Sequence, residues 1–454
     1  MTPYSIIQKK RDGHPLTQTE IQYFINGFVC GEIRDYQMAA FLMAVYFKGM
    51  DSDECVHLTM SMATSGETAD LSGIDGVKVD KHSTGGVGDK TTLALVPLVA
   101  ACGGIVGKMT GRELGHTGGT VDKLESIPGM KLDLETQQFI ENVNRIHAGL
   151  VAQTANLAPA DKLIYALRNV TATVDSIPLI AASVMSKKIA AGADAIVLDV
   201  KTGAGAFTPV YEDALSLAKT MVAIGTGAGR KVIAHITGME QPLGKAVGNS
   251  IEVQEAIGML AGKGPRDLDE LVAVLGSDML VLSGVAHTTA EAMERIEDSI
   301  SSGKALCKMG EMIAAQGGDL RVIDSPERLP QPKEKVEILA AESGYLTQLN
   351  AMGVGMASKL LGSGRKTKED RVDRSVGILL NRKIGDRVDR GEILAIFYTD
   401  GDPQKIDLAR GTFLDACRIG EEQIQPPKMF YARVTDTVIE EDPSFKQISD
   451  IGYK

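Results

Sequence analysis

Two glycine-rich segments, 81–89 and 110–120, contain the residue types that bind phosphate. Each follows a short apolar stretch, 77–79 and 105–109, and each is followed by a sequence typical of a helix. Glycine lets the backbone approach a ligand closely, and the N–H groups at a helix start attract anions. The segments therefore predict a phosphate site, with Lys81 adding a positive charge. The available hydroxyl donors are Ser83, Thr84, Thr91, Thr92, Thr110, Thr117 and Thr120.

The common nucleotide-binding motifs do not fit these segments. Residues 85–91 are not a Walker A loop, because Asp89 stands between the glycine and Lys90. Residues 225–230 miss the last glycine of the dinucleotide pattern. An ATPase and a NAD enzyme are therefore not the first expectation. A single glycine-rich loop can also serve only to make a turn, but two loops rich in hydroxyl groups favour phosphate binding.

A second group of polar residues lies between these loops and the next strand. Ser183 and Lys187 are four residues apart and so share one face of a predicted helix, and Arg168 lies near the end of the helix before it. Together they could hold a polar planar group. From spacing alone, an ordinary solvated helix face is the favoured interpretation.

Composition and charge restrict the class of protein. The chain has 454 residues, of which 44% are hydrophobic and 24% charged, as in a globular protein of two or three domains. Its net charge of −11 argues against nucleic-acid or anionic-membrane partners. Residues 78–123 have a positive net charge instead, with six Lys and Arg and four Asp and Glu, as binding of a small anionic substrate requires.

The cysteines and the N-terminus predict a cytoplasmic protein. The five cysteines are scattered, odd in number and without metal-binding spacing, which is typical of reduced thiols. Residues 1–12 lack the apolar core of a signal peptide, and the apolar stretch 93–106 is too short to span a bilayer.

The elements that must position these residues form an α/β fold with three parts. Residues 1–66 and 155–190 predict a helical domain, and 67–154 with 191–330 predict an α/β domain with a mostly parallel sheet. The run 195–200 is apolar except for Asp199, like a strand covered on both faces. Residues 331–454 predict a small α+β domain with a tail, similar to the hammerhead of biotinyl and lipoyl carriers. The comparable turn at 351–354 has no lysine, so no organic cofactor is expected.

Residues 81–89 and 114–125 closely resemble the thymidine and pyrimidine-nucleoside phosphorylase family, and 165–174 and 186–194 extend the resemblance. The resemblance covers roughly residues 1–425 and is nearest to the broad-specificity pyrimidine-nucleoside phosphorylases. It implies a cytoplasmic homodimer whose site lies between the helical and α/β domains. The implied activity is reversible phosphorolysis of uridine, thymidine and deoxyuridine to base and α-D-(deoxy)ribose 1-phosphate, in pyrimidine salvage.

The resemblance also assigns roles to particular residues. Catalysis falls to His82, Arg168 and Lys187. Lys108 is typical of members that accept both uridine and thymidine. The phosphate ligands are Lys81, Ser83, Thr92, Thr110 and Thr120. The residues that hold the pyrimidine and sugar are His82, Lys108, Arg168, Ser183 and Lys187. A monovalent cation, K⁺, is bound in the family at the positions of Gly88, Lys90, Leu243, Ala246 and Glu255.

Three departures from the family pattern bear on these roles. Thr110 replaces a serine and keeps its hydroxyl group, whereas Glu113 replaces a glycine and adds a carboxylate near the phosphate loop. Lys90 puts an ammonium group at a cation-ligand position, where it would replace or repel the ion. The alternatives are a strict thymidine phosphorylase, a phosphoribosyltransferase related in fold and a non-catalytic nucleoside-binding protein.

Overall fold

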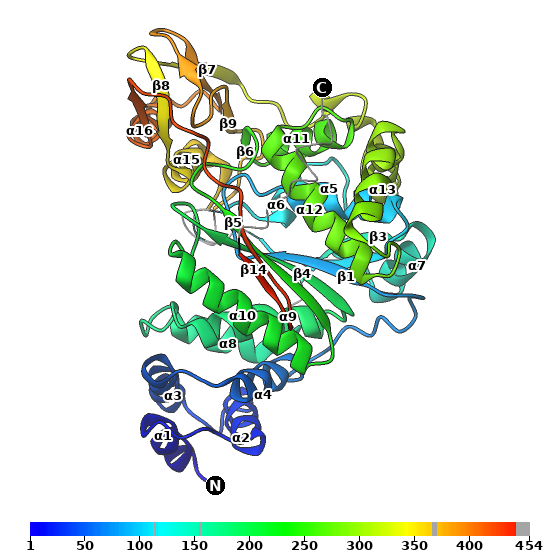
Figure 1. Cartoon of the computed structure of the whole chain (residues 1–454), viewed down its shortest axis with the longest axis vertical. Coiled ribbons are helices and arrows are strands. Elements are labelled where there is room, and N and C mark those ends of the chain that lie inside the picture. The colour runs from blue at the N-terminus through cyan, green and yellow to red at the C-terminus, as the bar shows by residue number, and fades with distance from the viewer. Residues whose placement is uncertain (113–114, 116, 154–155, 366–369, 442–454) are drawn as a thin grey trace.

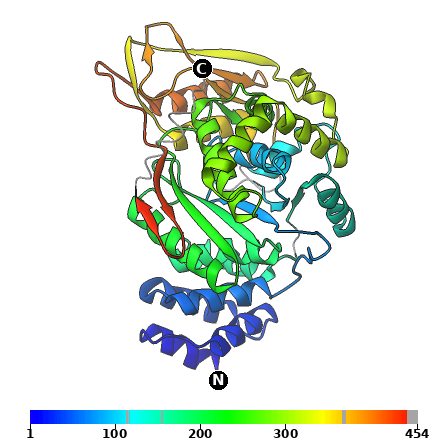
Figure 2. The same cartoon turned by 45° about the vertical axis from the view of Figure 1, so that its right-hand side comes forward.

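A computed structural model describes residues 1–112, 115, 117–153, 156–365 and 370–441. Three parts follow one another along the long axis (Figure 1). A helical domain lies at one end, an α/β domain in the middle and a small α+β domain at the other end. The same order is visible after a 45° turn (Figure 2). The predicted fold class is therefore confirmed.

The helical domain combines two separate stretches of the chain. Its helix α2 begins as the capping box at Thr17 and Glu20 predicts, with the Glu20 N–H donating to Thr17 Oγ1 over 3.3 Å. Phe24 and Phe41 stack in its core with ring centroids 4.7 Å apart. The helices are α1 (Pro3–Arg11), α2 (Gln18–Val29), α3 (Asp35–Lys48), α4 (Ser52–Ala63), α8 (Pro159–Arg168) and α9 (Ile177–Ala190).

The central sheet carries the phosphate-binding segments. Strands β1 (Val79–Ser83), β4 (Ala195–Thr202) and β5 (Lys231–Gly238) pair in parallel, with β4 in the middle and buried along its whole length. α9 and α10 (Tyr211–Gly227) pack together on one side. The stretch predicted as a strand at 77–79 overlaps β1 only at Val79, and β1 continues to Ser83 because all five of its residues pair with β4.

A second parallel pair continues this layer. β2 (Val106–Thr110) pairs with β3 (Ala148–Ala152), and a bridge between Lys78 and Ile105 joins β2 to the start of β1. The carboxyl ends of parallel strands meet at one edge of a sheet, so Ser83 and Thr110 end their strands on the same side. The helices that complete this domain are α5 (Thr91–Ala101), α6 (Thr120–Leu124), α7 (Thr136–Ile146), α11 (Ser250–Leu260), α12 (Arg266–Leu282), α13 (Thr289–Ser301) and α14 (Lys304–Ala315), with short 3₁₀ turns at Leu320–Val322 and Pro326–Arg328.

The C-terminal domain consists of two small sheets and two main helices. The α/β domain contributes one strand to it, because β6 (Ala246–Gly248) pairs with β9. The hammerhead comparison predicts a turn at residues 351–354. The structure instead has the start of helix α15 (Ala351–Ser358) there. The other elements are β7 (Glu334–Leu339), β8 (Gly344–Leu349), a π-helical turn (Lys359–Ser363), β9 (Gly377–Leu380), β10 (Arg387–Val388), β11 (Ile393–Thr399), α16 (Pro403–Asp415) and β12 (Cys417–Gly420).

Residues 430–441, part of the tail that we assigned to the C-terminal domain, pair instead with the α/β domain. Strand β13 (Phe430–Val434) pairs antiparallel with β5 of the central sheet, and β14 (Ile439–Glu441) pairs with β13. The physical reason is that β5 would otherwise present an unpaired edge. Arg433 on β13 also binds Asp278 on α12, at 3.0 Å.

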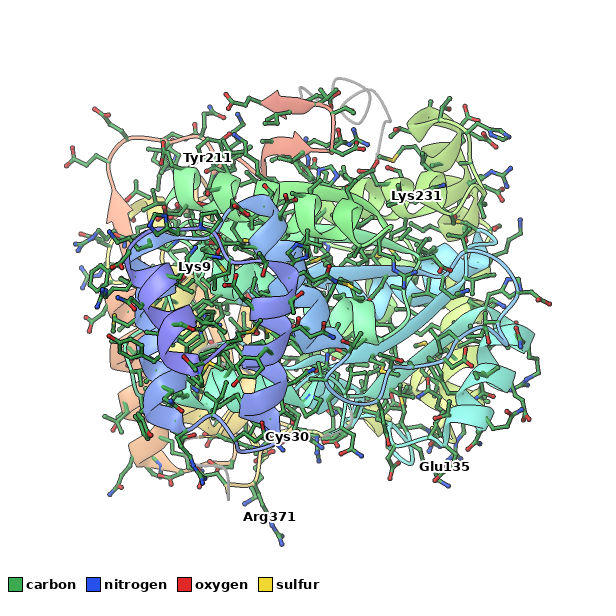
Figure 3. All side chains as sticks on the ribbon, turned by 90° about the horizontal axis from the view of Figure 1, so that it is seen from below. Lys9, Cys30, Glu135, Tyr211, Lys231 and Arg371 are labelled. Atoms are coloured by element: carbon green, nitrogen blue, oxygen red, sulfur yellow. The ribbon has the colours of Figure 1, made fainter. Side chains whose placement is uncertain are left out.

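Within the described residues, the side chains give no sign of a membrane segment or a disulfide. No helix in these ranges combines the length and apolarity that a bilayer crossing requires. All five cysteines are free thiols. Seen from the helical end, α1–α4 lie in front of only part of the α/β domain, with Lys9 in the foreground and Glu135, before α7, at the far edge (Figure 3).

Candidate active site

Strand β1 sends its side chains to two different neighbourhoods, because successive residues of a strand point to opposite faces. Lys81 lies among Asp89, Thr91 and Asp199, next to the start of α5. Asp80 faces the other way, toward Lys108 on β2 and Lys188 on α9. One face of β1 therefore contacts the phosphate loop, and the opposite face contacts β2 and the helical domain.

Lys81 is almost fully buried and is the cation of the first loop. Its Nζ donates to Thr91 Oγ1 over 2.5 Å and lies 3.5 Å from Asp89 Oδ2 and 3.3 Å from Asp199 Oδ2. Asp89 in turn accepts from the Thr91 N–H and hydroxyl at the start of α5. A buried ammonium group with two longer ionic contacts can turn to an anion placed at this loop.

Sequence reasoning missed a second buried lysine beside this loop. Lys201 lies near the end of β4 with its side chain fully buried, and its Nζ lies 2.9 Å from Asp199 Oδ2 and 3.0 Å from Thr237 Oγ1. Its backbone N–H donates to Thr84 Oγ1. The signal was its position at the carboxyl end of the predicted buried strand 195–200.

The other predicted phosphate ligands occupy the ends of neighbouring elements. Ser83 ends β1 and its Oγ accepts from the Gly85 N–H, while Thr92 lies in the first turn of α5. Thr110 ends β2 and Thr120 begins α6. Thr92 and Thr110 are buried within this edge. Glu113 lies outside the described residues.

The second loop is also held to the C-terminal domain, which sequence reasoning did not foresee. Arg112 binds Glu125 at 2.8 Å, and Arg374 of the C-terminal domain binds the same carboxylate. Arg365 binds Asp122, at 2.8 Å. The ion pairs of Arg365 and Arg374 join residues more than 240 positions apart, so no local pattern could reveal them.

On the opposite face of β1, Asp80 joins two strands and a helix. It accepts from Lys108 Nζ over 2.7 Å and from Lys188 Nζ over 2.8 Å, and Lys108 also donates to the Lys81 carbonyl. Burial opposes the charge of Asp80, yet the two ammonium groups hold its pKa at about 2. Burial lowers the pKa of Lys108 to about 7, with a further contribution from Lys188. This pair of contacts fixes α9 against the phosphate-binding strand.

His82 lies near the end of β1, and the charges that act on it belong to the Asp80 and α9 side of the strand. Burial, together with the positive charges of Lys188 and Lys108, lowers its pKa well below the usual value, and the charge of Lys187 acts in the same direction. The imidazole is therefore neutral at neutral pH, where it can donate one hydrogen bond and accept another.

Ser183 and Lys187 lie together on α9, as their spacing predicts. Lys187 Nζ donates to Ser183 Oγ over 3.1 Å and to Asp161 Oδ2 on α8 over 2.6 Å. The other Asp161 oxygen, Oδ1, is buried and has no hydrogen-bond partner within the described ranges. This face thus presents a hydroxyl group, an ammonium group and an acceptor to one place.

The side chain of Arg168, to which the resemblance gives a role at the base, is directed toward backbone carbonyls. Its side chain is 1% exposed, and its guanidinium donates to the carbonyls of Thr173, Val174 and Leu179. These three bonds hold the connection between α8 and α9. In this structure Arg168 organises the loop beside the Ser183–Lys187 face and does not extend from it.

The five residues assigned to a cation come together around Lys90. Its Nζ donates to the carbonyls of Leu243 over 2.9 Å and Ala246 over 2.8 Å, and to Glu255 Oε2 over 2.5 Å. The lysine is fully buried. Its ammonium group takes up the oxygens that would bind a potassium ion, so the residues present do not fit that ion.

Three family models match the chain, one in each of its three domains. The model of the glycosyl transferase family a/b domain matches residues 75–306, and the helical bundle domain of that family matches residues 4–66. The pyrimidine nucleoside phosphorylase C-terminal domain matches residues 345–419.

Two relatives cover most of the chain. A pyrimidine-nucleoside phosphorylase of Geobacillus stearothermophilus is 52% identical over 435 residues, which is 96% of this chain and 100% of the relative. One of Staphylococcus aureus (strain bovine RF122 / ET3-1) is 56% identical over 400 residues, covering 88% of this chain and 92% of the relative.

A solved structure shares the fold. The anthranilate phosphoribosyltransferase (TrpD) of Thermus thermophilus matches 68% of this chain and 99% of its own, with a TM-score of 0.55 and 18% identity. At this identity the likeness concerns the arrangement of helices and strands alone.

Proposed function

The chain belongs to the pyrimidine-nucleoside phosphorylase family, and from this premise we infer that it is an enzyme that cleaves pyrimidine nucleosides reversibly with inorganic phosphate. The products are the free base and α-D-ribose 1-phosphate, or the deoxyribose ester. The observation that carries the proposal is the position of Lys188, which joins α9 to Asp80 on β1 at 2.8 Å. This contact supports the proposal because it holds the residues proposed to bind phosphate near those proposed to bind the base.

Phosphate is proposed to bind at the carboxyl ends of β1 and β2. Lys81 supplies the nearest charge, and Ser83, Thr92, Thr110 and Thr120 supply hydroxyl groups. The buried setting strengthens these contacts because water does not screen them. The two longer contacts of Lys81, at 3.3 and 3.5 Å, support this reading, since they are weak enough for a bound anion to replace.

The base is proposed to lie against α9. Ser183 and Lys187 face one carbonyl edge of the pyrimidine, and the free acceptor of Asp161 suits its N3–H. As the C1′–N1 bond breaks, its electron pair moves to the base while a phosphate oxygen bonds to C1′. Lys187 then stabilises the negative charge that arrives on the base, an electrostatic effect that is usually the largest single contribution to such a step.

Proton balance limits the role of His82. Hydrogen phosphate loses its proton when it becomes the sugar ester, and the released base gains one at N1, so the reaction needs no net proton from the protein. Because the pKa of His82 is lowered, its imidazole serves as a hydrogen-bond partner of the O2 carbonyl rather than as a stored proton. His82 itself should then contribute no ionisation near pH 6.5 to the rate, so a titration near neutral pH belongs to Lys108 or to phosphate.

The substrate range is proposed to include uridine, thymidine and deoxyuridine, as in pyrimidine salvage. Lys108 supports a broad range because its ammonium group is held at the Lys81 carbonyl, between phosphate and base sites. The decisive experiment incubates the protein with each nucleoside, with and without phosphate, and measures free base and sugar 1-phosphate. Release of base only with phosphate supports phosphorolysis. Binding without turnover, or turnover only with a diphosphate sugar, would overturn it.

A homodimer in the cytoplasm is proposed as the working form. The helical domain exposes Tyr4, Tyr36 and Phe47 by 70% or more, and large exposed aromatic side chains of this kind favour a protein interface. The five free thiols suit a reducing compartment. Light scattering after size-exclusion chromatography gives the mass, and a monomer would contradict the dimer.

A further inference from the structure

The shell of oxygens around Lys90 has the composition of a monovalent-cation site. Two backbone carbonyls and one carboxylate point at a single position, and such oxygens can replace the hydration shell of a potassium ion. An ammonium group has three N–H donors, and Lys90 has one acceptor for each of them. The chain thus carries its own cation at this position, covalently attached.

The surrounding backbone leaves no room for the shell to expand. Gly88 has φ +72°, and a Cβ atom there would lie 2.5 Å from the Leu243 carbonyl oxygen and 3.2 Å from that of Ala246. Gly244 has φ +66°, and a Cβ atom there would lie 2.9 Å from Lys90 Nζ. Both glycines are therefore required for the backbone to close around the ammonium group.

The carboxylate in this shell is fixed from its other side. Glu255 accepts from the N–H groups of Lys245 and Ala246 at 3.0 to 3.2 Å, so it cannot turn away from Lys90. A potassium ion entering among the same oxygens would lie next to a buried positive charge. Like charges repel most strongly where water is excluded, so the ion and the ammonium group exclude each other.

The position of Lys90 connects this shell to phosphate binding. Lys90 directly follows Asp89, whose carboxylate binds Thr91 and lies 3.5 Å from Lys81, and it directly precedes α5. The Leu243 N–H also donates to the Val87 carbonyl, at 3.0 Å. The positive charge that binds the carbonyls of residues 243–246 therefore also fixes the turn 87–91, which forms the phosphate loop.

We propose that the Lys90 ammonium group takes the place of a bound potassium ion and makes the phosphate loop independent of monovalent cations. This rests on the proposed phosphorylase function only for its kinetic readout. Lys90 acts as a positioning residue, since it organises the loop without touching the substrates.

The wild-type protein tests the proposal without any mutation. Potassium is removed by dialysis, and KCl is then titrated against tetramethylammonium chloride at constant ionic strength. We expect kcat/KM for phosphate, and the melting temperature measured without substrate, to stay unchanged across the series. A rise of either quantity with KCl alone would overturn the proposal.

Lys90→Thr provides the complementary test, because a threonine hydroxyl group can serve as a neutral ligand to an ion. Without KCl, we expect kcat/KM for phosphate to fall by about tenfold. With KCl, both kcat/KM and the melting temperature should recover, while tetramethylammonium restores neither. A folded Lys90→Thr protein that ignores KCl would show that ammonium and potassium are not equivalent here.

A matched control removes a buried ion pair far from the loop. Lys10 is 3% exposed and binds Glu54 at 2.7 Å inside the helical domain. Lys10→Thr should lower the melting temperature without making it respond to KCl. If instead no variant or wild-type sample releases base in any buffer, the phosphorylase assignment fails, while the melting temperatures still decide the role of Lys90.

Discussion

The strand-end region around Lys81 and the helical face around Lys187 differ in what determines the direction of their side chains. On β1, alternation along the strand sends Lys81 to the phosphate loop and Asp80 to β2 and α9. On the helical side, Arg168 is long enough to reach several partners, and it binds the carbonyls of Thr173 and Val174 in the following loop and of Leu179 in α9. The alternation along β1 therefore determines where Lys81 and Asp80 point. The backbone between α8 and α9 determines where Arg168 points.

The two regions also differ in how their charges are compensated. Lys81 shares two carboxylates at 3.3 and 3.5 Å, which leaves its ionic contacts weak. Lys187 has a close contact with one carboxylate, at 2.6 Å. A substrate must compete with Asp161 for Lys187, whereas phosphate can join Lys81 with little rearrangement. The strand end is therefore preorganised to bind phosphate, whereas Lys187 on the helical face must exchange its contact with Asp161 when the base binds.

Lys81→Met should have the largest effect on turnover. The substitution removes the ammonium group proposed to face phosphate, so we expect kcat/KM for phosphate to fall about a thousandfold, or about 4 kcal/mol. Steady-state kinetics over a range of phosphate concentrations measures it. Lys201→Met is the matched control, because it removes another ammonium group from Asp199. Equal kinetic losses in the two variants would contradict a special role for Lys81.

Arg168→Ala should act mainly on stability. It leaves two buried carbonyls and one partly buried carbonyl without their donor, and we expect a loss of about 3 kcal/mol in the free energy of unfolding of the helical domain. Thermal melting monitored by circular dichroism measures it. A variant that melts like the wild type but has lost turnover would show that Arg168 acts on the base directly, as the family resemblance implies.

Lys187→Met should reduce turnover about a hundredfold, because it removes the cation proposed to stabilise the departing base. It also leaves Asp161 buried without its ion-pair partner, which lowers stability. The double variant Lys187→Met with Asp161→Asn separates the two effects. We expect it to regain the melting temperature but not the rate. Recovery of turnover along with stability would remove Lys187 from the reaction.

The sequence predicts the strand-end region better than the helical face, for physical reasons. The helices expected after the two glycine-rich segments are confirmed as α5 and α6, because the signals for them are local. The contacts of Asp80 with Lys108 and Lys188 depend on how β1, β2 and α9 pack, which no local pattern records. The same holds for β13, whose pairing with β5 joins residues nearly 200 positions apart.

The orientation of Arg168 illustrates the other limit of sequence reasoning. The spacing of Ser183 and Lys187 correctly places them on one face of α9, where they contact each other at 3.1 Å. Arg168, however, precedes a loop whose carbonyls turn toward it, and the conformation of that loop follows from tertiary packing. A family resemblance assigns a role to a residue, but it does not predict which groups the side chain contacts in this structure.

Lys108→Met should have the smallest effect and should act on selectivity rather than on rate. Methionine cannot donate to the Lys81 carbonyl, while Asp80 keeps its contact with Lys188, so the strand pair should remain intact. We expect the ratio of kcat/KM for thymidine over that for uridine to rise by about fivefold, since one lost polar contact near the sugar changes discrimination modestly. Parallel assays with both nucleosides measure it. An unchanged ratio would place selectivity on the helical face and leave Lys108 with only the joining of β1 to β2.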